Sequence, residues 1–176
     1  FTGTRGTGKT STAKIFAKAL NCDAPIAGEP CGECPSCRIA ETGGVDIIEL
    51  DAASNTGVED MRALIDKARF APLDLRVKVY IIDEAHMLSK SAFNALLKTL
   101  EEPPAHVVFI LATTEPQSIP ATIVSRCQRF DFHRLRVEDI VSCMESVLKS
   151  AGASIAPEGM VAIARAAEGG MRDALS

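Results

Sequence analysis

The chain has 176 residues, of which 47% are hydrophobic and 24% are charged, and its formal net charge is −4. These values fit a folded protein of one domain, or one domain and part of a second. They exclude wholesale disorder and a surface coated with basic residues for nucleic-acid binding. No apolar run approaches the roughly 20 residues of a membrane helix, and no secretory signal opens the chain, so we expect a cytoplasmic protein without a membrane partner.

Helices and strands alternate along the first 133 residues. Strands are expected at 45–50, 77–82, 107–112 and, at a sheet edge, 128–132. Helices are expected at 11–20, 58–68 and 91–100, and an irregular stretch rich in Pro and Gly lies at 22–37. From residue 134 the pattern contains only helices, at 137–151 and 157–168. The alternation predicts an α/β fold with a parallel sheet covered by helices on both faces, followed by a smaller helical module.

A phosphate-binding loop opens the chain. Gly3-Thr-Arg-Gly-Thr-Gly-Lys9-Thr10 matches G-x-x-x-x-G-K-[ST] at every fixed position. The glycines let backbone N–H groups surround a phosphate, Lys9 would reach the β- and γ-phosphates, and the Thr10 hydroxyl would bind Mg²⁺. The helix that follows adds its positive N-terminal end. The residues predicted to bind nucleotide are Gly3, Thr4, Gly6, Thr7, Gly8, Lys9, Thr10 and Ser11.

The two ends of the sequence suggest a truncated chain. A phosphate loop normally follows a buried strand, and two residues ahead of Gly3 leave no room for one. The last six residues, MRDALS, resemble the start of a helix. We therefore expect an excerpt of a longer protein, cut at both ends.

An apolar strand ending in two carboxylates follows about seventy residues later. In Val79-Tyr-Ile-Ile-Asp83-Glu84, Asp83 would hold Mg²⁺ through water or through Thr10, and Glu84 would polarise the attacking water. An Asp-Glu pair after a strand is by itself equally compatible with two solvated charges. The complete phosphate loop upstream favours the catalytic interpretation.

Four cysteines fall within sixteen positions, at Cys22, Cys31, Cys34 and Cys37. Thiolates at C-x₂-C spacing can converge on one tetrahedral ion, and four of them form a closed, structural Zn²⁺ site. Disulfides and an iron–sulfur cluster remain as alternatives, although the ferredoxin spacing C-x₂-C-x₂-C-x₃-C would need a cysteine where Glu41 stands. Cys127 and Cys143 stand alone and are expected to be buried.

Further motifs accompany these, namely DAASN at 51–55, IDEAHMLSKSAFNALLKTLEEPP at 82–104, LATTEP at 111–116, SRC at 125–127 and AAEGGMRDALS at 166–176. With them, the chain resembles the gamma/tau family of clamp-loader ATPases of bacterial DNA polymerase III over essentially all of its length. The resemblance implies an AAA+ fold, with a RecA-like parallel five-stranded sheet flanked by helices. Residues 1–133 would form the nucleotide-binding core with a zinc module inserted at 22–37, and residues 134–176 would begin a small helical lid.

The resemblance also implies catalytic roles that the residues alone do not. Thr114 takes the first-sensor position, with Thr113 as the alternative. Arg126 takes the position of an arginine finger, acting in trans on ATP bound to the neighbouring subunit; without the resemblance it would be predicted as an ion pair at the sheet edge. Arg172 takes the second-sensor position and would reach the γ-phosphate from the lid.

The implied function is an ATP-hydrolysing motor subunit that opens a sliding clamp and loads it onto primed DNA during replication. ATP, Mg²⁺ and structural Zn²⁺ are the implied cofactors. The implied partners are the other subunits of a pentameric loader, the clamp, primer-template DNA bound through its backbone, and the polymerase core, through regions outside this chain. Candidate DNA contacts are residues 54–57 and 89–91 with Lys90 and Lys98. Phe70 is either an anchor for the clamp or a core residue.

Three other functions compete with this one. A non-hydrolysing scaffold of delta-prime type would keep the cysteines and SRC but carry a degraded phosphate loop, whereas Lys9, Thr10, Asp83 and Glu84 are all present here. Another AAA+ DNA-remodelling ATPase would lack the cysteine module. A zinc-dependent nucleic-acid-binding module would need basic or aromatic residues between the cysteines, and residues 22–37 hold three acidic residues and no aromatic one.

Overall fold

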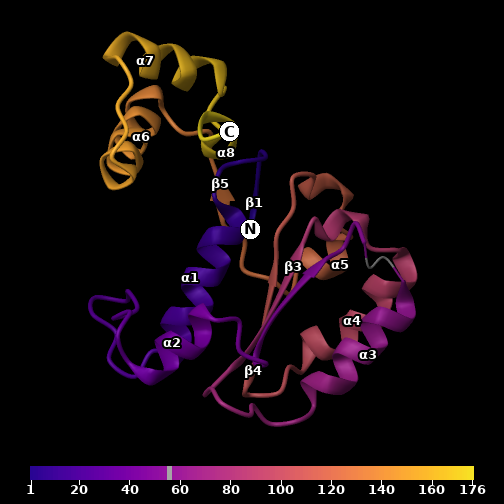
Figure 1. The fold of residues 1–176 in the computed structure, drawn as a ribbon. Helices are drawn as coiled ribbons and strands as arrows, with labels where there is room; N and C mark the ends of the chain where they lie inside the picture. Colours follow the sequence, from indigo (N-terminus) through magenta and orange to yellow (C-terminus); the bar gives the residue numbers. More distant parts are fainter. Residues whose placement is uncertain (55–56) are drawn as a thin grey trace.

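A computed structural model describes residues 1–54 and 57–176 (Figure 1). Its strands are β1 (Thr2–Gly3), β2 (Ile47–Asp51), β3 (Lys78–Asp83), β4 (Val107–Leu111) and β5 (Asp131–Phe132). Its helices are α1 (Lys9–Asn21), α2 (Pro35–Glu41), α3 (Val58–Ala68), α4 (Lys90–Glu101), α5 (Ala121–Val124), α6 (Val137–Ala151), α7 (Pro157–Ala166) and α8 (Met171–Ala174). Short 3₁₀ turns lie at Ala85–Met87 and Pro116–Ser118.

The strands form a parallel sheet in the order β2-β3-β4-β1-β5. β2, β3 and β4 pair continuously, and β1 pairs with β5. A bridge between Thr2 and Thr113 joins the two groups, since Gly3 N donates to Thr113 O at 3.2 Å and Thr113 N donates to Phe1 O at 3.0 Å. The predicted parallel sheet is confirmed, and the strand before the phosphate loop lies between β4 and β5.

Two expectations about the strands were wrong. Two residues of the strand before the phosphate loop are present, although no room for this strand was expected ahead of Gly3. The edge strand predicted at 128–132 is ordered as a strand only at Asp131–Phe132. The two strands pair in parallel with each other, Thr2 with Asp131 and Gly3 with Phe132.

Helices cover both faces of the sheet (Figure 1). Alternate side chains of β3 point to opposite faces, so Val79 and Ile81 pack with α1, and Tyr80 and Ile82 pack with α3 and α4. The fully buried residues that α1, α3 and α4 contribute to these two faces are Ala13, Ala17, Met61, Ala68, Ala92 and Leu96. The near-continuous apolar sequence of β3 is therefore explained by burial on both sides.

Helices α6, α7 and α8 form a separate small cluster beyond the end of β5 (Figure 1). Ile140 and Met144 of α6 pack there against Met160 and Ala164 of α7. We refer to residues 134–176 as the helical module. Within the described residues, no helix is long and apolar enough to cross a membrane.

Candidate nucleotide site and cysteine cluster

The phosphate loop forms a tight turn between β1 and α1. Gly8 ends the turn at φ 90° and caps α1, whose first residue is Lys9. Only glycine fits at position 3, because a Cβ on Gly3 would lie 2.3 Å from the carbonyl oxygen of Phe132. Gly6, at φ 77°, lies against the helical module, where Met171 N donates to Gly6 O at 2.9 Å.

A cavity of about 430 Å³ opens beside this loop. The lining includes most of the predicted nucleotide-site residues, namely Gly6, Thr7, Gly8, Lys9, Thr10, Ser11, Asp83, Glu84 and Arg172. Four predicted residues lie outside the lining: Gly3, Thr4, Thr114 and Arg126. Gly3 and Thr4 instead contribute their carbonyl oxygens, as the contacts of Lys9 show.

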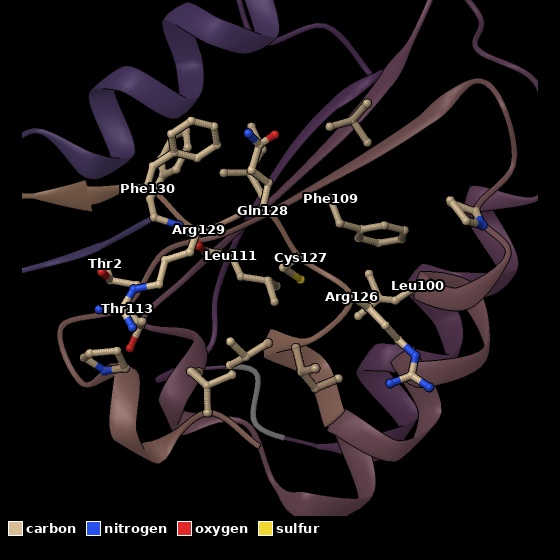
Figure 2. A pocket seen from close by; sticks show the side chains of 18 of the residues that line it. Thr2, Leu100, Phe109, Leu111, Thr113, Arg126, Cys127, Gln128, Arg129 and Phe130 are labelled. Carbon is tan, nitrogen blue, oxygen red and sulfur yellow. Dashed lines mark hydrogen bonds between the residues drawn. The ribbon is translucent and has the colours of Figure 1, made fainter. Parts of the chain in front are cut away.

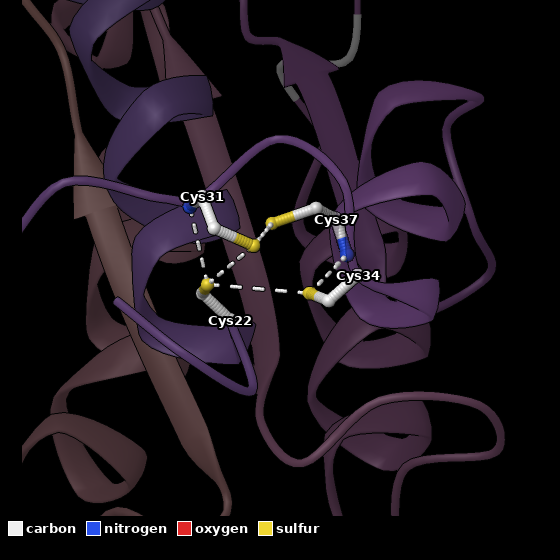
Figure 3. Close-up of side chains that lie close together, drawn as sticks. All are labelled: Cys22, Cys31, Cys34 and Cys37. Carbon is white, nitrogen blue, oxygen red and sulfur yellow. Dashed lines mark hydrogen bonds between the residues drawn. The ribbon is translucent and has the colours of Figure 1, made fainter. Parts of the chain in front are cut away.

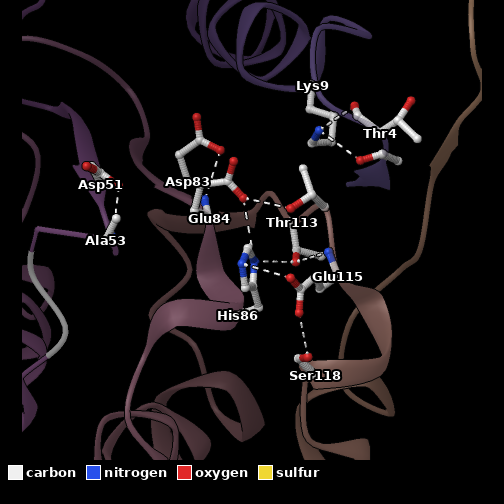
Figure 4. Close-up of polar contacts among 12 residues, drawn as sticks. Thr4, Lys9, Asp51, Ala53, Asp83, Glu84, His86, Thr113, Glu115 and Ser118 are labelled. Atoms are coloured by element: carbon white, nitrogen blue, oxygen red, sulfur yellow. Dashed lines mark hydrogen bonds and ion pairs between the residues drawn. The ribbon is translucent and has the colours of Figure 1, made fainter.

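The Lys9 side chain folds back over its own loop. Its Nζ donates to Gly3 O at 3.0 Å and to Thr4 O at 2.9 Å (Figure 4). Lys9 is 6% exposed, and burial lowers the pKa of its ammonium, while the nearby carboxylates of Glu84 and Asp83 oppose that shift. Lys9 therefore lines the cavity with little of its surface exposed to water.

Thr10 and Asp83 meet directly. The Thr10 hydroxyl donates to Asp83 Oδ2 at 2.6 Å, and Asp83 Oδ1 accepts the backbone N–H of Glu84 at 2.9 Å. A hydroxyl and a carboxylate side by side next to a phosphate loop provide oxygen ligands of the kind Mg²⁺ takes.

Glu84 has a left-handed backbone conformation, with φ 46° and ψ 43°. Such a conformation costs a non-glycine residue about 1–3 kcal/mol and is common at functional sites. The Oε2 atom of Glu84 accepts a hydrogen bond from the Thr114 hydroxyl at 3.1 Å. Thr114, three residues after the end of β4, therefore contacts the carboxylate and does not line the cavity.

The sequence did not identify the apolar part of the lining. Leu135, Met171 and Leu175 come from the helical module, and Arg5 comes from a variable position of the loop. No spacing rule marks the three apolar residues, because they reach the cavity through the position of the helical module. That position is fixed by single contacts such as Met171 N to Gly6 O at 2.9 Å.

The four clustered cysteines converge on one point (Figure 3). All their sulfur atoms lie within 4.8 Å of one another, with Cys22 at 3.5 Å from Cys31 and 4.0 Å from Cys34. A tetrahedral Zn²⁺ with bonds of about 2.3 Å places its sulfur ligands about 3.8 Å apart. All four are free thiols, so the disulfide alternative does not describe this structure, and the set fits a tetrahedral metal.

The region that carries this cluster is more regular than the sequence suggested. Residues 22–37 were expected to be irregular, but α2 begins at Pro35. The Cys34 sulfur caps this helix by accepting the backbone N–H of Cys37 at 3.4 Å, and the Cys22 sulfur accepts the N–H of Cys31 at 3.3 Å. Such N–H donors stabilise thiolate charge.

Arg126 lies away from the cavity of its own chain. Its Nη2 contacts Glu101 Oε1 at 2.5 Å, and its Nη1 donates to the carbonyl of Thr122 at 2.6 Å. It borders a second, apolar cavity of about 420 Å³ beside β4 and Phe130 (Figure 2). Cys127 borders that cavity as well and is exposed, and Cys143 is partly exposed, so the expectation that both are buried was wrong.

The candidate DNA and clamp residues lie on the surface. Lys90 and Lys98 of α4 are exposed. Of the segment 54–57, residues 55–56 lie outside the described part of the chain. Phe70 is 70% exposed, which excludes the alternative that it is a core residue.

The architecture and the loop define a nucleotide-binding protein of the AAA+ class. A family model described as "DNA polymerase III, delta subunit" matches residues 1–136, and one described as "DNA polymerase III clamp loader subunit, ATPase lid domain" matches residues 139–176. The chain belongs to the family of DNA polymerase III clamp-loader subunits.

Individual relatives agree with this assignment. The chain is 58% identical to DNA polymerase III subunit tau of Bacillus subtilis strain 168, covering 100% of this chain and 31% of that protein. It is 55% identical to subunit tau of Escherichia coli strain K12, covering 100% of this chain and 28% of that protein. The chain thus spans about a third of the length of these relatives.

Solved structures support the fold alone. The Holliday junction branch migration motor RuvB of Thermotoga maritima superposes with a TM-score of 0.68 at 18% identity, over 99% of this chain and 50% of that one. A point mutant of the same motor gives 0.69 at 17% identity, over 99% and 51%.

Proposed function

We propose that the chain is the nucleotide-binding part of an ATP-hydrolysing motor subunit of the DNA polymerase III clamp loader, which uses ATP to open the sliding clamp and load it onto primed DNA. The observation that carries this proposal is the meeting of Lys9, Thr10, Asp83 and Glu84 at one cavity. Phosphoryl transfer depends on such a set of positioned charges.

Each residue of the cavity has a proposed role. Lys9 releases the carbonyls of its loop and binds the β- and γ-phosphates, together with the loop's N–H groups. Thr10 and Asp83 hold Mg²⁺, which when bound neutralises phosphate charge. Glu84 orients the attacking water and accepts its proton. Arg172 faces the γ-phosphate from the helical module, and its charge already acts on the pKa of Lys9.

We extend the proposal to the assembled loader. Thr114 senses the γ-phosphate through its bond to Glu84, with Thr113 as the alternative, and Arg126 acts on the nucleotide of the adjacent subunit. The partners are the other subunits of a pentamer, the clamp through the exposed Phe70, primer-template DNA near Lys90 and Lys98, and the polymerase core through regions outside this chain. The proposed location is the cytoplasm.

A non-hydrolysing scaffold of delta-prime type remains the second candidate. The description of the family model over residues 1–136 names a delta subunit. The phosphate loop and its carboxylates are complete, with Lys9, Thr10, Asp83 and Glu84 all present. This favours the motor, because a protein that does not hydrolyse ATP does not require a carboxylate that orients water beside a magnesium site.

The substitution Glu84→Gln tests whether the chain is an ATP-hydrolysing motor or a non-hydrolysing scaffold. In the full-length protein, assembled with its partners, we expect ATP binding within about twofold of wild type and turnover lowered at least about 100-fold, since general-base catalysis contributes about 10²–10⁴. Calorimetry measures binding, and phosphate release measures turnover.

Glu145→Gln, on the exposed face of α6, is the matched control and should hydrolyse normally. Normal turnover by Glu84→Gln would assign the base elsewhere. A wild-type protein that binds ATP without hydrolysing it, even with clamp and primed DNA, would indicate the scaffold.

We propose that the four cysteines hold one structural Zn²⁺. Four thiolates leave no open position for a catalytic water, and the free energy of metal binding adds to the stability of the folded state. The cluster begins where α1 ends, since Cys22 caps that helix, so metal binding would stabilise the helix that carries the phosphate loop.

Cys34→Ser should therefore lose the metal and lower the thermal unfolding midpoint by several degrees, without removing any residue of the nucleotide cavity. Elemental analysis should find one zinc per wild-type chain. Cys143→Ser, which alters a lone cysteine of α6, should keep the metal. Iron in place of zinc, or an unchanged midpoint for Cys34→Ser, would contradict the assignment.

A further inference from the structure

His86 lies between the ends of β3 and β4. It sits in the 3₁₀ turn Ala85–Met87, directly after the two carboxylates, and its side chain is 11% exposed. Its Nδ1 lies 3.0 Å from the Thr113 hydroxyl and 3.5 Å from Glu84 Oε2, whereas its Nε2 is 3.9 Å from the nearer carboxylate oxygen of Glu115 (Figure 4). The two ring nitrogens therefore face different groups, and Nδ1 makes the closer contacts.

Thr113 is a rigid anchor for the imidazole. It is 2% exposed, and its hydroxyl accepts the backbone N–H of Glu115 at 3.0 Å. Its backbone bonds to Phe1 and Gly3 place it where β4 meets β1. A hydroxyl has one proton and two lone pairs, so Thr113 can bind Glu115 N and His86 Nδ1 simultaneously.

The turn that carries His86 is also fixed. Ala85 N donates to Ala112 O at 2.9 Å, and Met87 N donates to Glu84 O at 2.8 Å. The Glu84 side chain, by contrast, is 36% exposed and follows a backbone in the left-handed region. It needs neighbours to hold it in one rotamer, and the structure offers two, the Thr114 hydroxyl and the imidazole of His86.

We propose that His86 is a positioning residue for Glu84. It joins the carboxylate that follows β3 to the buried Thr113, two residues after the end of β4, so that the water-orienting group holds its position against the sheet. The inference rests on the proposed ATPase function of this site. It assigns His86 no contact with nucleotide, so its loss should affect the rate of hydrolysis and leave ATP affinity unchanged.

Three substitutions test the geometry in the full-length protein assembled with its partners. His86→Ala should lower kcat at least about tenfold while the Kd for ATP changes less than about twofold, because small displacements of a catalytic group are costly. The side-chain amide nitrogen of Asn stands where Nδ1 stands, and that of Gln stands where Nε2 stands. His86→Asn should therefore restore kcat to within about threefold of wild type, and His86→Gln should remain as slow as His86→Ala.

Several outcomes overturn the inference: normal turnover by His86→Ala, equal rescue by Asn and Gln, no rescue by Asn, or ATP affinity that falls in parallel with kcat. Thermal unfolding of each variant identifies a folding defect, and the comparison of Asn with Gln remains decisive if the Ala variant is unstable. Glu84→Gln distinguishes the two levels of proposal. If that variant is inactive while His86→Ala is normal, only the role of His86 fails; if Glu84→Gln is active, the proposed function of the carboxylate fails.

Discussion

Replacing Lys9 with alanine is expected to abolish ATP binding by the full-length protein. The ammonium would make two charge-assisted hydrogen bonds to phosphate, each worth about 1.5–3 kcal/mol. Their loss should weaken binding at least about 100-fold, since each 1.4 kcal/mol is a factor of ten. Isothermal titration calorimetry measures the effect directly.

Lys14→Ala is the matched control for this variant. Lys14 is on the same helix, but its side chain is 55% exposed and pairs with Glu49 at 2.7 Å. An exposed pair contributes about 0–1 kcal/mol to stability, so this variant should bind ATP normally. Thermal unfolding without nucleotide checks that Lys9→Ala still folds after Gly3 and Thr4 lose their hydrogen-bond donor. Unchanged ATP affinity for a folded Lys9→Ala would disprove the phosphate-loop assignment.

Most helices and strands of the core could be predicted from the sequence, because the spacing of their apolar residues matches the face that each of them buries. The bounds expected for 58–68 and 137–151 are those of α3 and α6, since each has a clear apolar face and few competing turn residues. The strand expected at 77–82 differs from β3 by one residue at each end. The phosphate loop and the two carboxylates were found because their chemistry requires fixed spacings.

The features that the sequence missed depend on contacts between distant segments. The partner of β5 is β1, which lies at the opposite end of the nucleotide-binding core in sequence. Leu135 and Leu175 reach the cavity only because the helical module lies against Gly6. His86 and Thr113 are separated by 27 positions and meet at adjacent strand ends. The local periodicity of hydrophobic residues does not reveal such contacts between distant segments.

The proposed role of Arg126 is action on the nucleotide of a neighbouring subunit. The residue lies outside the lining of its own nucleotide cavity, and its guanidinium is held by Glu101 and by the carbonyl of Thr122. Its side chain is 32% exposed. If its only role were this ion pair, its removal would cost about 0–1 kcal/mol of stability and no activity.

Arg126→Ala is therefore expected to keep ATP binding by the isolated subunit near normal, while clamp- and DNA-stimulated hydrolysis by the assembled loader falls at least about tenfold. Arginine fingers elsewhere contribute about 10³–10⁵ in rate.

Arg129→Ala, three residues away and paired with Asp131 at 2.7 Å, is the matched control and should leave hydrolysis unchanged. The decisive experiment mixes Lys9→Ala subunits with Arg126→Ala subunits in one assembly. Where a Lys9→Ala subunit presents its Arg126 to the nucleotide of an Arg126→Ala subunit, that site has both groups, whereas the reverse arrangement lacks both. Rates that depend on which subunit's arginine faces which nucleotide would establish action in trans. Weakened ATP binding by the isolated Arg126→Ala subunit, or undiminished turnover in the assembly, would show that Arg126 serves only its pair with Glu101.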